Sequence, residues 1–133
     1  MRNGRRRARG AIAVACGAVV LGTFGVPALW AGGAKWTAPP LAAARVNPLA
    51  VDAGLPGGRK LFGERCASCH GDAGQGTRMA PDLRERDVQD QSDGALFWKI
   101  SQGNTRRGMP TYSYLPEPQR WQLVLTVRSL SSH

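Results

Sequence analysis

Two cysteines and a histidine fall close together near the middle of the chain. Cys66, Cys69 and His70 form the pattern Cys-Ala-Ser-Cys-His. On a helical turn, residues i, i+3 and i+4 lie on one face, so two thiols can bond the edge of a flat macrocycle while the imidazole reaches a metal at its centre. This spacing is the attachment pattern of haem c. It predicts one haem per chain, bound covalently at Cys66 and Cys69, with His70 as an axial ligand of the iron.

Two other uses of this cluster fit less well. A zinc site would need a fourth ligand, and the remaining cysteine and histidine are Cys16, near the start, and His133, at the end. A redox dithiol should stand at the head of a βαβ unit, and no such unit is visible in the sequence.

The iron would need a sixth ligand or an open site. The candidates are Met79, Met109 and His133. Met79 follows His70 so soon that the chain would have to turn very quickly around the haem edge. Met109 comes after an intervening helix, and Gly108 and Pro110 beside it shape a polar loop that can point a thioether inward. We therefore expect Met109 to be the second axial ligand, which would raise the reduction potential.

Helices are expected to position these residues. A short helix over residues 58–69 should run into the Cys-His motif. A second should be capped by Ser92 and ended by Gly103, and a terminal helix should have Pro116 at its first position. Residues 71–91 and 104–115 are expected to be loops. No segment alternates convincingly as a strand would.

The basic charge is concentrated at the start of the chain. The formal net charge is +9 at pH 7, and five arginines precede the first apolar run, whereas no acidic residue occurs before Asp52. This distribution predicts a targeting signal and excludes a nucleic-acid-binding surface. The uncharged run over residues 11–34 is long enough for a retained membrane anchor but rich in glycine, so a cleaved signal ending at Ala34 stays open. By the positive-inside rule the rest of the chain lies outside the cytoplasm.

The expected organisation has three parts. Residues 1–34 are a signal-anchor or signal peptide, residues 35–54 a Pro/Ala-rich linker, and residues 55–133 the haem domain. Pro39-Pro40 should stiffen the linker into an extended tether that holds the domain off a membrane surface.

The chain resembles class I cytochromes c over about residues 47–133. The motifs of the family occur in the family's order, and they are Gly58, Phe62, Cys66-x-x-Cys69-His70-Gly71, Pro81-Asp82-Leu83, Met109-Pro110 and Arg120-Trp121. The segment from Ser92 to Ile100 also resembles bacterial members that serve membrane or periplasmic enzymes. The resemblance implies an all-α fold, a small cytochrome c fold in which short helices wrap around one haem.

The resemblance also implies roles for single residues. Pro81 would present its carbonyl to the second nitrogen of His70, and three side chains would pack on the haem, namely Leu83, Trp98 and Ile100. Gly58 would lie where the first and last helices cross. The family usually has an aromatic residue near Thr126, so this crossing is expected to be packed less tightly here.

The implied function is single-electron transfer rather than catalysis. A periplasmic carrier, anchored or soluble, would pass electrons between membrane or periplasmic oxidoreductases. Its expected partners are redox proteins and, through the N-terminal segment, the membrane, with no nucleic acid and no small-molecule substrate. A fixed cytochrome subunit of a larger oxidoreductase stays open, as does a haem sensor or peroxidase with an open iron. A peroxidase would need a distal acid or base, and His133 is the only histidine besides His70.

Overall fold

The structure, a computed structural model, describes residues 36–131. The expected leader therefore lies outside the described residues, as do Cys16 and His133. The elements are α1 (Pro40–Ala43), α2 (Val51–Arg65), α3 (Ala67–His70), α4 (Arg86–Gln89), α5 (Asp93–Gln102), the 3-10 turn η1 (Thr105–Arg107) and α6 (Glu117–Ser129). This part of the chain contains no strand, and its one β-bridge joins Asn104 to Met109. The all-α expectation is confirmed. Over the same residues, no helix has the length and apolarity needed to span a bilayer.

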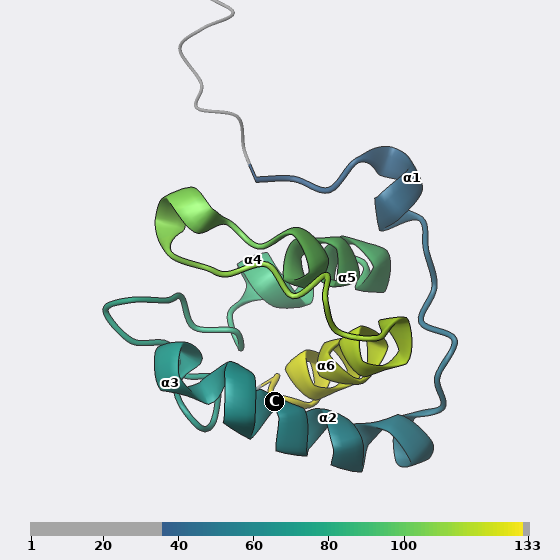
Figure 1. Cartoon of the computed structure of the whole chain (residues 1–133), viewed down its shortest axis with the longest axis horizontal. Coiled ribbons are helices and arrows are strands. Elements are labelled where there is room, and N and C mark those ends of the chain that lie inside the picture. Colours follow the sequence, from purple (N-terminus) through teal and green to yellow (C-terminus); the bar gives the residue numbers. More distant parts are fainter. Residues whose placement is uncertain (1–35, 132–133) are drawn as a thin grey trace, which may run out of the picture. The chain divides into compact units, whose positions relative to one another are not determined.

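The longest two helices, α2 and α6, cross and pack against each other (Figure 1). Gly58 lies at the crossing, as the resemblance implied. A Cβ atom added there would collide with the Thr126 hydroxyl and with the Gln122 carbonyl group, whose carbon would be only 2.7 Å away. Thr126 is almost fully buried. The crossing is therefore close rather than loose, because a residue without a side chain faces a small one and the helix backbones can approach each other.

The helix α2 begins at Val51, seven residues before the expected start at Gly58 (58 − 51). The run Gly54-Leu55-Pro56-Gly57-Gly58 is rich in residues that disfavour helices, which is why the sequence pattern pointed to a later start. Tertiary packing overrides that preference, because Gly54 and Gly58 are both buried in the contact with α6.

The described part of the expected linker packs against the domain instead of extending from it. Ala38 is buried, α1 lies against α5, and residues 51–54 are already helical. Gly94 in α5 leaves room for the backbone carbonyls of Ala42, Ala43 and Arg45. The Arg45 guanidinium covers the rings of Phe97, at 4.5 Å, and Trp121, at 5.1 Å. The contacts at Gly94 and Arg45 use backbone carbonyls and one cation, so they leave no hydrophobic period in the sequence.

The second expected helix has the predicted ends. The Ser92 hydroxyl accepts a hydrogen bond from Ala95 N at 3.2 Å and caps α5, and Gly103, with φ of 63°, follows its last residue. The terminal helix α6 starts at Glu117, one residue later than expected, with Pro116 as its N-cap.

The expected loop over residues 71–91 contains one short helix, α4. Gln89 attaches α4 to its surroundings, because its side-chain amide donates to Leu83 O at 2.7 Å and to Val127 O at 2.9 Å. The sequence pattern did not predict α4, since a single turn is too short to show a period.

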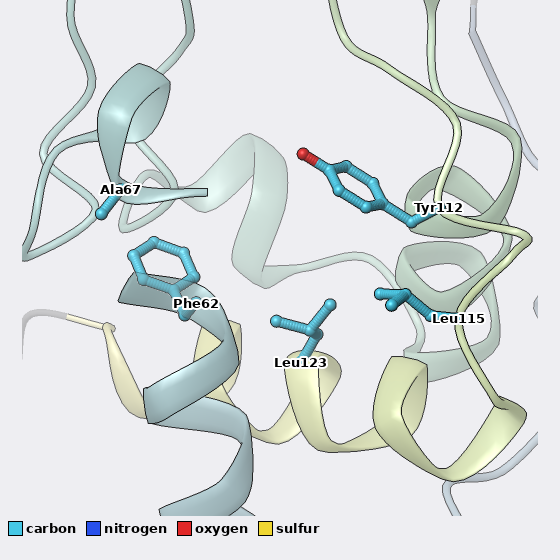
Figure 2. Packing of buried hydrophobic residues seen from close by; sticks show 5 residues of the cluster. All are labelled: Phe62, Ala67, Tyr112, Leu115 and Leu123. Carbon is cyan, nitrogen blue, oxygen red and sulfur yellow. The ribbon is translucent and has the colours of Figure 1, made fainter. Parts of the chain in front are cut away.

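Two buried clusters both include residues of α6. The Phe62 cluster (Figure 2) consists of Phe62, Ala67, Tyr112, Leu115 and Leu123. The Trp121 cluster consists of Leu96, Phe97, Trp121, Val124 and Val127. The Phe62 cluster joins α2 and α6 to the loop that follows Met109, and it therefore borders the predicted haem residues.

Candidate haem site

The two cysteines and the histidine lie on one tight turn. Helix α2 ends at Arg65 because Cys66 leaves the helical conformation, with φ of −120°, and α3 then begins at Ala67. The amide groups of Cys69 and His70 both donate to Cys66 O, at 3.1 and 2.9 Å. Cys66 and Cys69 form no disulfide bond with each other. Burial, and secondarily the neighbouring Cys69, raises the pKa of Cys66 to about 11.

The imidazole of His70 is held from one side. Its Nδ1 lies 3.0 Å from Pro81 O. A carbonyl oxygen can only accept, so Nδ1 carries the proton in this hydrogen bond and Nε2 is left with a lone pair for a metal. This is the contact that the resemblance implied for Pro81.

The loop after His70 is tied back to the motif, and these bonds place Pro81. Gly76 N donates to His70 O at 2.7 Å, and the Thr77 hydroxyl donates to Cys69 O at 2.6 Å. Gly76 has φ of 76°, and a Cβ atom there would lie 2.6 Å from Asp82 N. Sequence reasoning missed Gly76 and Thr77, although closely spaced glycines in this loop pointed to positive φ values.

An ion pair follows directly after Pro81. Arg84 Nη2 lies 2.6 Å from Asp82 Oδ2, and the side chain and backbone of Arg84 both donate to the Asp82 carboxylate. These hydrogen bonds lower the pKa of Asp82 to about 2. The ion pair therefore fixes the residues directly after Pro81, whose carbonyl oxygen accepts the hydrogen bond from His70.

Met109 lies at the end of a small closed loop. Asn104 N donates to Met109 O at 2.9 Å, Met109 N donates to Asn104 O at 3.1 Å, and η1 turns between them. Gly108 takes the left-handed conformation that this turn requires, with φ of 85°. The Met109 side chain is half-buried and packs against the Phe62 cluster, as does Cys66. Met79, in contrast, is 67% exposed.

The three predicted packing residues have different surroundings. Leu83 and Ile100 are partly buried against both clusters. Trp98 is half-buried in α5 but is not among the side chains that pack against either cluster. Leu83 and Ile100 therefore pack against the same cluster as Cys66 and Met109, the Phe62 cluster, whereas the packing of Trp98 on the haem stays a prediction.

The sequence of this chain matches a known protein family. The model of a family described as cytochrome C oxidase, cbb3-type, subunit III, matches residues 53–125. The chain belongs to this cytochrome c family. A solved structure, the KustC0563 c-type cytochrome, is similar to this cytochrome at 27% identity, over 56% of this chain and 98% of that one, with a TM-score of 0.51. The comparison with curated proteins gives no match.

Membership of this family makes haem c the cofactor, with electron transfer as the class of function. The residues of this cytochrome fit such a group. They offer two cysteines outside any disulfide and an imidazole on one turn, with a thioether packed on the same apolar cluster as Cys66. The groove at the α2–α6 crossing, about 330 Å³ in volume, includes none of these four side chains in its lining.

Tyr112 is a residue near this site that sequence reasoning did not single out. Its ring is buried in the Phe62 cluster, and its hydroxyl donates to Arg65 O at 2.8 Å. Figure 2 shows the ring extending from the loop after Met109 toward the segment that carries Ala67. Burial is the main cause that raises the pKa of Tyr112 to about 12, so the phenol keeps its proton and stays a donor at neutral pH.

Proposed function

We propose that this cytochrome is a single-electron carrier of the class I, monohaem type, with Cys66 and Cys69 as the attachment residues and His70 and Met109 as the axial ligands. The observation that carries the proposal is the hydrogen bond of His70 Nδ1 to Pro81 O, since it orients the ring and leaves Nε2 for the iron. The packing of Met109 and Cys66 on one cluster supports the assignment of the second ligand.

Haem c supplies a one-electron ferric/ferrous couple when it is bound. The chain's own groups would tune that couple. The Pro81 carbonyl keeps the proton on His70 Nδ1, and the soft thioether of Met109 favours the ferrous state and so raises the potential. The Phe62 cluster excludes water from one side of the site. Leu83 and Ile100 would pack on the macrocycle, whereas the same role for Trp98 has no contact in its favour.

We place the domain on the periplasmic side of a bacterial cytoplasmic membrane, held there by residues 1–34 as an anchor or released after their cleavage. The cationic start and uncharged run of this segment support the placement. A role as the fixed cytochrome subunit of a larger oxidoreductase is the second candidate, and the description of the matching family favours it. In either case the partners are redox proteins.

Covalent attachment is tested by denaturing electrophoresis and acid–acetone extraction of the purified protein. Haem should stay with the chain, because thioether bonds survive both treatments. The variant Cys66→Ala/Cys69→Ala should lose all haem under the same conditions. Release of haem from the parent protein would end the proposal.

The axial ligand is tested with Met109→Ala and its matched control Met79→Ala. The first variant should bind carbon monoxide when reduced and should have a lower potential, because it loses the thioether. The second should behave as the parent, since Met79 is exposed. The reverse result would move the ligand to Met79, and carbon monoxide binding by the parent would favour a sensor or peroxidase.

The mass of the native protein tests the leader. A full-length membrane-bound chain would support an anchor, and a mature chain that begins near Lys35 would support a cleaved signal and a soluble carrier.

A further inference from the structure

The break between α2 and α3 leaves the carbonyl of Arg65, directly before the attachment turn, without a backbone donor. A helix end leaves its last carbonyls without partners in the helix. The amide groups of Cys69 and His70 donate to Cys66 O and do not reach the carbonyl of Arg65. The Tyr112 hydroxyl occupies this position, at 2.8 Å from Arg65 O. The carbonyl directly before the first attachment cysteine is thus satisfied from the other side of the Phe62 cluster.

Tyr112 is itself firmly held. Its backbone amide donates to Ile100 O at 3.2 Å, and the hydroxyl of Thr111 donates to Ser101 O at 2.7 Å, so this part of the chain is fixed to the end of α5. The ring is only 8% exposed. A stiff aromatic side chain therefore joins the segment after Met109 to the end of α2.

No second hydrogen bond of the described residues supports this link between the segment after Met109 and α2. Among the hydrogen bonds of residues 36–131, that of Tyr112 to Arg65 is the one that links residues 104–115 to α2 or α3. The other bonds of the loop run within it, as between Asn104 and Met109, or to α5 and α6.

We propose that Tyr112 is a positioning residue for the sixth ligand, because its hydrogen bond to Arg65 holds the loop that carries Met109 against the turn that carries the cysteines. The inference rests on the proposed ligation by Met109. For an external ligand to replace Met109 on the iron, the loop has to move away from the attachment turn. The hydrogen bond of Tyr112 opposes that movement and so favours ligation of the iron by the Met109 sulfur.

The test measures how tightly imidazole binds to the ferric holoprotein, where it must displace Met109. Tyr112→Phe keeps the ring and removes the hydroxyl, and we expect imidazole to bind about tenfold more tightly. That factor corresponds to about 1.4 kcal/mol, within the range for a lost bond to a buried acceptor. The matched control is Tyr114→Phe, since Tyr114 lies 6.1 Å away between ring centroids and is 63% exposed. It should bind imidazole as the parent does.

Two further measurements separate positioning from general stability. Val124→Ala removes buried volume from the Trp121 cluster, so it should lower the unfolding midpoint and leave imidazole binding unchanged. Without added ligand, hydrogen exchange at the amides of residues 104–112 should be faster in Tyr112→Phe than in Val124→Ala. Imidazole binding equal in Tyr112→Phe and the parent, or equally increased in Val124→Ala, would overturn the inference.

Met109→Ala, measured in the same series, distinguishes the two proposals. It should bind imidazole more tightly than every other variant. If it binds like the parent, the ligand assignment is wrong and the role of Tyr112 falls with it. If it binds more tightly while Tyr112→Phe does not, only the role of Tyr112 is refuted.

Discussion

Replacing Gly58 by alanine should destabilise the domain, although alanine is the better helix former. The new Cβ atom would lie 2.7 Å from the Gln122 carbonyl carbon and closer still to its oxygen. These are backbone atoms that cannot rotate away, so the helices α2 and α6 must separate. Overpacking costs about 1–3 kcal/mol, and the rigid obstacle places Gly58→Ala at the upper end. The intrinsic preference of helices for alanine returns about 0.5–1 kcal/mol, so we expect a net loss of about 2 kcal/mol.

Gly63 in the same helix is the matched control. No atom lies within 4 Å of a Cβ atom added there. Gly63→Ala should therefore only gain the helical preference and stabilise the domain by about 0.5–1 kcal/mol. Urea unfolding of the two holoproteins, followed by circular dichroism, gives the free energies. A Gly58→Ala protein as stable as the parent would show that the helices are not in close contact at this crossing, and equal changes in both variants would refute the role given to packing.

Three further predictions concern a cap, an ion pair and a docking surface. Ser92→Ala removes the cap of α5 and should lower the free energy of unfolding by about 1–2 kcal/mol in urea, whereas Ser92→Thr should recover most of it. Hydrogen bonding from Trp121, and then from Arg45, lowers the pKa of Glu117 below its ordinary value of 4.5. The ionised Glu117 side chain therefore stabilises the fold above pH 4.5, and this stabilisation is lost as the pH falls below that value. The melting temperatures of the parent and Glu117→Gln should converge in acid. A difference between them that does not change with pH would contradict this. Reversing the charge of exposed Arg106 and Arg107 to glutamate should slow electron transfer with an acidic partner at low salt and little at high salt, and rates equal to the parent's throughout would place the docking face elsewhere.

Local chemistry determined much of this protein from the sequence alone. The attachment motif required only a turn that brings two cysteines and a histidine to one face, and Cys66, Cys69 and His70 lie on such a turn. The cap at Ser92 and the end of α5 at Gly103 were also predicted, since each depends on the conformation of a few neighbouring residues. The family motifs then gave the helical fold and the haem, whereas the ligand role of Met109 stays a prediction.

Tertiary contacts decided the features that the sequence pattern did not indicate. Helix α2 extends through Gly54 and Pro56 because the glycines of this region pack against α6, and the expected linker lies on α5 because backbone carbonyls fit where Gly94 has no side chain. The hydrogen bond of Tyr112 to Arg65 depends on the break between α2 and α3 at Cys66, which leaves the Arg65 carbonyl without a backbone donor. Backbone groups far away in the sequence take part in these contacts, namely Gln122 O at Gly58, Ala42 O at Gly94 and Arg65 O at Tyr112. Every residue carries the same backbone groups, so residue types and their spacing do not record which of them will meet.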